Sequence, residues 1–401
     1  MFLLVLSAAD VDKIASTLTL DDLQYLMAQI FARLSSSSAG HGSGLGVSMP
    51  PRISIQTDNH TALFMPARIG PPPPLGAGSG TSSDSTDQLG QTAIKVVSVP
   101  KKDSSKGLPA TTLVLDEATG SVKAVVNARK LTALRNAAGS LLSTSLVGPT
   151  QPRSIIAFGA GQQIDVHLNL HLRQFATITK CTIVNRTLNA RAVSLRERLA
   201  TRFLHLDINL LSSNADANDI NSVQQLSLLE QTLRSADIII CATSSTTPLF
   251  PSTWVKNGTH VILIGSYTPS MREVEKALVL RSIPSQISLN NPTKGLPILL
   301  VDSREACSHE SGELIDAKIT PLQMTEIGEI IPKNEANVVS RESYLSNLKP
   351  PGEIRAGFDG PISIFKSVGV GLQDVAIASA IVDKACSMEG IIGTRIQDYD
   401  T

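Results

Sequence analysis

Residues 154–163, SIIAFGAGQQ, decide the fold of this 401-residue chain. The run begins with apolar residues that predict a buried strand, and Gly159 and Gly161 then interrupt it. Gly159 is expected to make the tight turn after the strand. Gly161 is expected to let the backbone approach a pyrophosphate at the N-terminus of a helix that starts near Gln163. This order is typical of a nucleotide-binding unit, although Ile164 replaces the third small residue of the full pattern.

Short β-branched runs alternate with helical segments after this turn, at 181–186, 235–243, 260–266 and 298–303. The alternation predicts an α/β domain with a parallel, doubly wound sheet, the Rossmann arrangement. Ligands of such sheets bind at the carboxyl ends of the strands. The candidate cofactor-binding residues at these ends are Gly159, Gly161, Gln162, Gln163, Asn185, Arg186, Thr187, Thr243, Ser244, Ser245, Gly265 and Tyr267.

The end of the second strand of this sheet indicates which nicotinamide cofactor binds. A carboxylate there would accept hydrogen bonds from the ribose of NAD, whereas an arginine favours the 2′-phosphate of NADP. The chain has Asn185, Arg186 and Thr187 at this point, with Arg191 close behind. The sequence therefore predicts NADPH, with NADH as the alternative.

The N-terminal part has a different pattern. A strand and an amphipathic helix are expected within the first 35 residues, and alternating runs that start at 52, 61, 93, 111 and 121 predict antiparallel strands of an α+β domain. A helix is expected from Leu131, and 148–153 reads as a linker. Residues 71–91 are rich in Pro, Gly, Ser and Asp, so we expect a mobile surface insertion there.

Composition excludes several classes of protein. The chain has 35 Lys and Arg and 35 Asp and Glu, so its charge balance does not favour nucleic-acid binding. No uninterrupted apolar run approaches the roughly 20 residues of a membrane span. The four cysteines are far apart and indicate free, mostly buried thiols in a reducing compartment, so a cytoplasmic location is expected. They are Cys181, Cys241, Cys307 and Cys386.

Ordered motifs along nearly the whole chain resemble the ornithine cyclodeaminase/mu-crystallin family. They include PPRISIQ, LFMPA, IKVVSVP, LTALRNAAGS, AFGAGQQ, VNRT, ADIIICATSSTTPLF, LIGSYTPSMRE, HESGEL and SVGVGLQDVA. The resemblance implies a Rossmann domain inserted into an α+β substrate and dimerisation domain, and a homodimer. We then expect the substrate domain at 1–147, the Rossmann domain at 152–345, and a segment at 346–401 that returns to the substrate domain.

The resemblance also implies substrate-binding residues, namely Arg52, Lys95 and Arg135, with Lys95 as the catalytic group. An Arg fork suits the carboxylate of an imino or amino acid, and a lysine can donate a proton to the reacting nitrogen. Since a guanidinium is costly to bury without a partner, the substrate carboxylate is the partner expected for Arg135. Asp374 corresponds to a family turn near the nicotinamide, but it can equally cap the last helix.

One residue departs from the cyclodeaminase pattern. Tyr267 stands where cyclodeaminases carry an Asp that acts on the substrate amine, and a phenol does not replace a carboxylate. This favours reduction of a cyclic α-imino acid, either pyrroline- or piperideine-2-carboxylate, to proline or pipecolate. Ornithine cyclodeamination to proline and ammonia is the second interpretation, and a non-catalytic binder of NADPH or another small ligand is the third.

Two further pairs of residues invite a functional interpretation. His167 and His171 have a spacing that can bind zinc, but without a third ligand nearby in sequence they are expected to be packed or solvated. Glu310 and Glu313 resemble paired catalytic carboxylates, but they are expected to start and cap a helix. No metal site is expected.

Overall fold

The computed structural model describes residues 2–38, 46–71, 90–101, 108–214, 220–284, 298–334, 339–342, 344, 361–390 and 392–400. The chain divides into two compact units. Unit 1 contains Met1–Arg135, Pro332–Ser343 and Val370–Thr401, and unit 2 contains Asn136–Ile331 and Tyr344–Gly369. Helix α3 (Leu131–Val147) begins in unit 1 and continues in unit 2.

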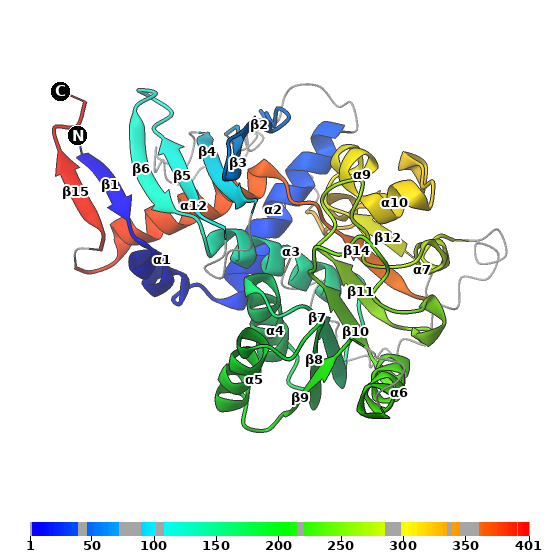
Figure 1. Ribbon diagram of the computed structural model, residues 1–401. Coiled ribbons are helices and arrows are strands. Elements are labelled where there is room, and N and C mark those ends of the chain that lie inside the picture. The colour runs from blue at the N-terminus through cyan, green and yellow to red at the C-terminus, as the bar shows by residue number, and fades with distance from the viewer. Residues whose placement is uncertain are drawn as a thin grey trace. The chain divides into compact units, whose positions relative to one another are not determined.

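Unit 1 is built on a seven-stranded sheet of order β15-β1-β6-β5-β4-β3-β2 (Figure 1). The five expected strands are present and form an antiparallel run from β2 to β6. Strand β1 adds to β6 in parallel, and β15, which the sequence did not predict, adds to β1 antiparallel. The strands are β1 (Phe2–Leu6), β2 (Ile53–Gln56), β3 (His60–Ile69), β4 (Gln91–Pro100), β5 (Ala110–Leu115), β6 (Val122–Asn127) and β15 (Thr394–Gln397).

Helix α12 (Gly371–Ser387) lies along this sheet and contacts β3, β4, β5 and β6 (Figure 1). Its sequence is apolar, and accordingly most of its side chains are buried. The amphipathic helix expected near the N-terminus is two helices, α1 (Ala8–Ala15) and α2 (Leu20–Ser38). They separate because Thr19 and Asp22 exchange backbone and side-chain hydrogen bonds that start a new helix.

Unit 2 contains an eight-stranded parallel sheet of order β13-β12-β14-β11-β10-β7-β8-β9, so the predicted α/β Rossmann arrangement is confirmed. The strand order reverses beside β7, which makes its carboxyl end the position where such sheets bind ligands. The strands are β7 (Ser154–Phe158), β8 (Lys180–Asn185), β9 (Asp207–Ser212), β10 (Ile238–Cys241), β11 (His260–Leu263), β12 (Ile298–Val301), β13 (Thr325–Glu326) and β14 (Ser363–Lys366).

Helices lie on both sides of this sheet, with α4 and α5 on one side and α6 on the other (Figure 1). Their bounds are α4 (Gln162–Gln174), α5 (Ala190–Arg202) and α6 (Ile220–Ser235). The shorter elements are α7 (Lys276–Arg281), α9 (Arg304–Glu310), α10 (Gly312–Asp316) and the 3₁₀ turns η2 (Ser252–Trp254), η3 (Pro321–Gln323) and η4 (Ile327–Glu329).

Two expectations about the second half of the chain need correction. Strand β9 was not predicted, because its side chains alternate between buried and exposed at the sheet edge and form no apolar run. Strand β14, within the segment expected to return to the first domain, instead pairs with β11 and β12 in unit 2, and unit 1 resumes at Val370. The insertion expected at 71–91 lies almost wholly outside the described residues.

Three buried histidines of unit 2 form hydrogen bonds with hydroxyl groups in the second half of α3. The Nε2 atoms of His167, His171 and His260 lie 2.9, 3.0 and 3.1 Å from the hydroxyls of Ser140, Thr144 and Ser143, respectively. Burial is the main reason that the pKa of each imidazole is lowered, to about 3, 4 and 3. His167 and His171, which were expected to be packed or solvated, are packed.

Candidate functional site

A buried cluster of three charged side chains brings together distant parts of unit 1. Lys95 comes from β4, Arg135 from the first half of α3, and Asp374 from the first turn of α12. The Lys95 Nζ atom lies 2.6 Å from Asp374 Oδ2, and the Arg135 Nε atom donates to Asp374 Oδ1 at 3.0 Å. Arg135 Nη1 also donates to the Gln373 Oε1 atom at 2.7 Å. All three charged side chains are almost completely buried.

The period of β4 explains why a lysine enters this interior. Ala93, Lys95 and Val97 alternate with more exposed neighbours, so all three lie on one face of the sheet. Helix α12 packs against β4 and carries Asp374 in its first turn. The strand thus places an ammonium group where the helix supplies a carboxylate.

The cluster has two cations for one carboxylate, and this imbalance shapes its acid–base behaviour. Burial lowers the pKa of Lys95 to about 8, helped by Arg135 and Arg52 and opposed by Asp374. Burial works against ionisation of Asp374, but Arg135 and Lys95 outweigh it and keep the pKa of this carboxyl below its usual value. The ammonium group of Lys95 is therefore a proton donor suited to near-neutral pH.

Two expectations change with this geometry. Arg135 has buried partners within the protein, Asp374 and Gln373, whereas the substrate carboxylate was the expected partner. Asp374 does not cap its helix through its side chain, because both carboxylate oxygens face Lys95 and Arg135; Gln373 Oε1 accepts from the Val370 amide instead. Arg52, just before β2, is half-buried and close enough to lower the pKa of Lys95.

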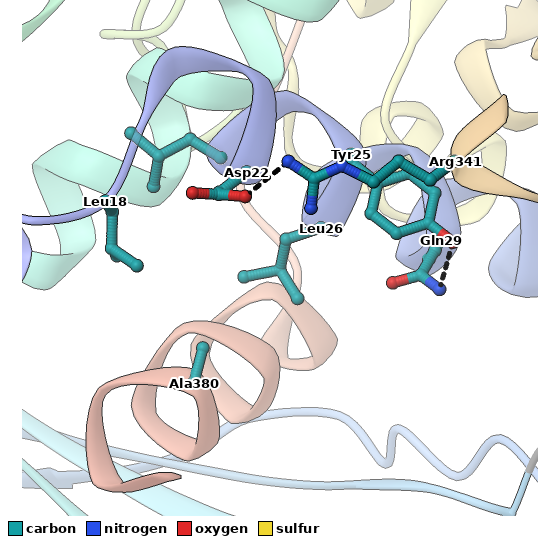
Figure 2. A pocket seen from close by; sticks show the side chains of 8 residues that line it. Leu18, Asp22, Tyr25, Leu26, Gln29, Arg341 and Ala380 are labelled. Atoms are coloured by element: carbon teal, nitrogen blue, oxygen red, sulfur yellow. Dashed lines mark hydrogen bonds and ion pairs between the residues drawn. The ribbon is translucent and has the colours of Figure 1, made fainter. Parts of the chain in front are cut away.

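A separate pocket of about 120 Å³ in unit 1 contains none of these residues. Figure 2 shows Arg341 between Asp22, with which it forms an ion pair, and the ring of Tyr25, over which its guanidinium lies. Gln29 donates to the Tyr25 hydroxyl at 3.1 Å. The opposite charges of Asp22 and Arg341 neutralise each other, so this pocket offers less attraction for an anion than the Lys95 cluster does.

The glycine turn of unit 2 has the geometry that the sequence predicts. Gly159 has φ of +113°, and a Cβ atom there would lie 3.0 Å from the Ala242 carbonyl oxygen. Gly161 is the N-cap of α4, makes no side-chain capping bond, and has open space where a Cβ would be. Ile164 is fully buried beside Gly159. The open helix N-terminus fits a pyrophosphate group.

The segment after β8 is open to solvent. Arg186 and Thr187 are exposed, and Asn185 is half-buried with its side chain donating to the Thr187 carbonyl oxygen at 2.7 Å. Among Asn185, Arg186 and Thr187 the one charge is the guanidinium of Arg186, so the ribose end of a nucleotide would meet a positive group there.

The turns after β10 and β11 contain the other five candidate residues of this sheet. Glu273, which was not predicted from the sequence, binds both turns. The carboxylate of Glu273 accepts hydrogen bonds from the amide and hydroxyl of Thr243 at 2.6 and 2.9 Å. Its other oxygen accepts from the Gly265 amide at 2.8 Å. Ser244 is exposed, Ser245 is buried and Tyr267 is half-buried. The sequence around Glu273, MREVE, resembles an exposed charged run and gives no signal of burial.

Glu313 was expected only to start or cap a helix, but it also forms a buried ion pair. It lies in the first turn of α10, but its side chain is buried and its Oε1 atom lies 3.0 Å from the Nζ atom of Lys366. Glu310 ends α9. The four cysteines are free thiols, and three of them are buried, as expected. Within the described residues no cluster suited to a metal and no helix long and apolar enough to cross a membrane is found.

Comparisons with known proteins agree with this fold. Ketimine reductase mu-crystallin of Rattus norvegicus is 27% identical over 294 residues, covering 72% of this chain and 74% of that protein. A Delta(1)-pyrroline-2-carboxylate reductase of Bacillus cereus is 25% identical over 356 residues, covering 86% and 87%. The structure of Thermococcus litoralis Delta(1)-pyrroline-2-carboxylate reductase with NADH and L-proline superposes with a TM-score of 0.68 at 22% identity, covering 98% and 99%. Residues 6–389 match the family model itself, and the chain belongs to the ornithine cyclodeaminase/mu-crystallin family.

Proposed function

We propose that this protein is an NAD(P)H-dependent oxidoreductase that reduces the C=N bond of a cyclic α-imino acid. The observation that carries the proposal is the buried cluster of unit 1, where Lys95 and Arg135 share the single carboxylate of Asp374. Two cations grouped around one carboxylate favour the binding of an anionic substrate beside them. The open glycine turn of unit 2 supplies the second requirement, a helix N-terminus that fits a dinucleotide.

The chemistry of an α-imino acid matches the cations of unit 1. Arg52 and Arg135 hold the substrate carboxylate, since a guanidinium is suited to this planar anion. Lys95 donates a proton to the nitrogen as the C=N bond is reduced, and its pKa of about 8 allows this near neutral pH. The reduced nicotinamide, when bound, supplies the hydride. One proton and one hydride convert the imine to the amine.

The relatives and Tyr267 support the proposed class of substrate. Relatives named as ketimine and pyrroline-2-carboxylate reductases favour a cyclic imino acid such as pyrroline-2-carboxylate, with proline as product. Piperideine-2-carboxylate, which would give pipecolate, is the alternative with a six-membered ring. Tyr267 occupies the position of the cyclodeaminase carboxylate, which favours reduction over ornithine cyclisation. We also propose that Arg186 favours NADPH over NADH, because a guanidinium attracts the 2′-phosphate.

A homodimer formed through unit 1 is part of this proposal. Strand β2 ends the sheet as described, and its Ile53 and Ile55 side chains are 60% and 52% exposed. A sheet edge with exposed isoleucines is suited to burial against another chain. Light scattering coupled to size-exclusion chromatography would give the mass in solution, and a monomeric mass would contradict the dimer.

The function is tested with a panel of substrates and both nucleotides. We expect rapid oxidation of NADPH with Δ1-pyrroline-2-carboxylate or Δ1-piperideine-2-carboxylate, and slower oxidation with a linear keto acid plus amine. Release of ammonia from ornithine without net oxidation of nucleotide would instead show a cyclodeaminase. Tight NADPH binding without turnover of any imino acid would show a non-catalytic binder.

A further inference from the structure

Glu273 is the residue of unit 2 whose burial the proposed chemistry leaves unexplained. It follows the loop after β11 and is fully buried. One of its oxygens accepts from the Thr243 amide and hydroxyl, and the other accepts from the Gly265 amide. The carboxylate therefore binds at once the turn after β10 and the turn after β11.

The two turns pack closely against each other, so their positions depend on the hydrogen bonds that the Glu273 carboxylate accepts. A Cβ atom on Gly265 would overlap the backbone of Thr243 and crowd Glu273. The Arg272 amide donates to the Ser245 carbonyl oxygen at 2.9 Å, and the Leu249 amide donates to the Glu273 carbonyl oxygen at 2.8 Å. The turns thus pack directly on each other, with the acceptor atoms of Glu273 at their junction.

The charges around Glu273 come from neighbouring elements. Lys366, at the end of β14, donates to the Ser266 carbonyl oxygen at 2.5 Å and pairs with Glu313 of α10. Burial raises the pKa of the Cys241 thiol, at the end of β10, and the charges of Glu273 and Glu313 add to this effect. Burial raises the pKa of Glu273 to about 7, with Glu313 adding to this effect and Lys366 and the two backbone amides opposing it.

We propose that Glu273 is a positioning residue for the nicotinamide nucleotide: as a carboxylate it holds the Thr243 and Gly265 turns in the form that receives the nucleotide, and its protonation releases them. The inference rests on the proposed function, because it takes these turns as part of the nucleotide site. A protonated carboxyl has no negative charge and carries a hydrogen on one oxygen, so it accepts more weakly from the three donors that now join the turns to it.

Protonation of Glu273 affects folding and binding in opposite directions. Its carboxyl has a higher pKa in the folded state, so the folded state binds more protons than the unfolded state between pH 4.5 and about 7. This group's contribution to stability is therefore full below pH 4.5 and is lost as pH rises through 7. Nucleotide affinity should instead fall as pH falls through 7, which general loss of structure would not explain.

The test compares Glu273→Gln with Glu275→Gln. Glu275 lies two residues further along and accepts a hydrogen bond from the Ser252 amide at 2.7 Å, so its variant is a matched control that leaves both turns alone. Dissociation constants for NADPH and NADH are measured between pH 6 and 9 by fluorescence of the reduced nucleotide. The ratio between the two variants removes the titration of the NADPH 2′-phosphate, which is common to both.

We expect the unaltered protein and Glu275→Gln to bind about fivefold more weakly at pH 6 than at pH 8. Glu273→Gln should bind about tenfold more weakly at pH 8 and show no such pH dependence, since an amide places an N–H against one of the turns. Its KM for nucleotide should rise, while kcat and the KM for the imino acid stay within about twofold.

Two results would overturn the inference, and they are distinguishable. If the unaltered protein binds neither nucleotide at any pH, the proposed function fails together with the role of Glu273. If it binds nucleotide equally well at pH 6 and 8, only the role of Glu273 fails; this measurement uses the unaltered protein and so does not depend on the folding of a variant. Equal affinity of Glu273→Gln and Glu275→Gln at pH 8 would also rule it out.

Discussion

The two units each bury a cluster of three charged side chains, in opposite proportions. The cluster of unit 1 has two cations, Lys95 and Arg135, around one carboxylate. The cluster of unit 2 has two carboxylates, Glu273 and Glu313, around the ammonium group of Lys366. A buried charge usually needs a partner. The partner of the charge that is in excess in each cluster therefore indicates the role of that cluster.

The extra carboxylate of unit 2 is satisfied inside the protein, by Thr243 and Gly265. It therefore joins backbone segments. In unit 1, two cations lie around the carboxylate of Asp374, and we propose that an anionic substrate binds beside them. Two equally buried charge clusters thus have different surroundings: that of unit 2 joins backbone segments, and that of unit 1 is the proposed substrate site.

Removing the ammonium group from unit 1 should have the largest effect. Lys95→Met should lower kcat about 10³-fold, because general acid catalysis typically contributes about 10²–10⁴-fold. Nucleotide affinity should stay normal. The control is Lys123→Met, which removes a half-exposed lysine on β6 paired with Asp383 and should leave kcat unchanged. Turnover of Lys95→Met within tenfold of normal would remove Lys95 as the proton donor.

The second-largest effect is expected from changing the shape of the Arg135 side chain. Arg135→Lys keeps the charge beside Asp374 but loses the planar fork. We expect normal folding and nucleotide binding, with kcat/KM for the imino acid lower by about 10²-fold or more, equivalent to about 2.7 kcal/mol. Steady-state kinetics measures this, and near-normal kcat/KM would show that Arg135 acts on Asp374 alone.

A smaller effect is expected at the nucleotide end of unit 2. Arg186→Ala should weaken NADPH binding by about 1.5–3 kcal/mol and NADH binding much less, because only NADPH carries the 2′-phosphate. Arg202→Ala, at the other end of α5, is the control. Titration of both nucleotides checks the result; equal losses for NADPH and NADH would contradict the assignment of Arg186.

The smallest effect is a dependence on pH. As pH rises above about 8, Lys95 loses its proton and kcat/KM should fall by up to tenfold per pH unit. The folded state lowers the pKa of Lys95 from 10.5, so the unfolded state binds more protons between pH 8 and 10.5. The contribution of Lys95 to stability therefore rises over the same range. A fall in kcat/KM that follows unfolding instead, as measured by circular dichroism, would contradict this origin.

Local patterns predicted much of the fold. The glycine turn at Gly159 and the alternation of strands and helices predicted the parallel sheet, because both depend on residues close in sequence. The sheet to which β14 belongs was not predictable in this way, because a short apolar strand fits either sheet. Its membership is determined by its pairing with β11 and β12. Strand β9 lacked an apolar run for a related reason, its exposed edge.

The candidate site was predictable in part. Motifs identified Lys95, Arg135 and Asp374 as site residues, but their mutual contacts depend on α12 packing against β4, which no periodicity reveals. The same holds for Glu273, whose burial follows from the approach of two turns separated in sequence from it. Residue types were therefore accessible from the sequence, whereas the partner of each buried charge was not.

The position of Asp374 has a consequence for how the protein is made. Asp374 follows Arg135 by 239 residues, and the helix that carries it is the last long element of the chain. A ribosome therefore releases strands β1 to β6 and the start of α3 long before it synthesises the carboxylate that pairs with Lys95 and Arg135. Unit 2 is translated within that interval, so the interior of unit 1 closes only after α12 is made. A nascent chain that stops before α12 holds two cations with no counterion from that helix.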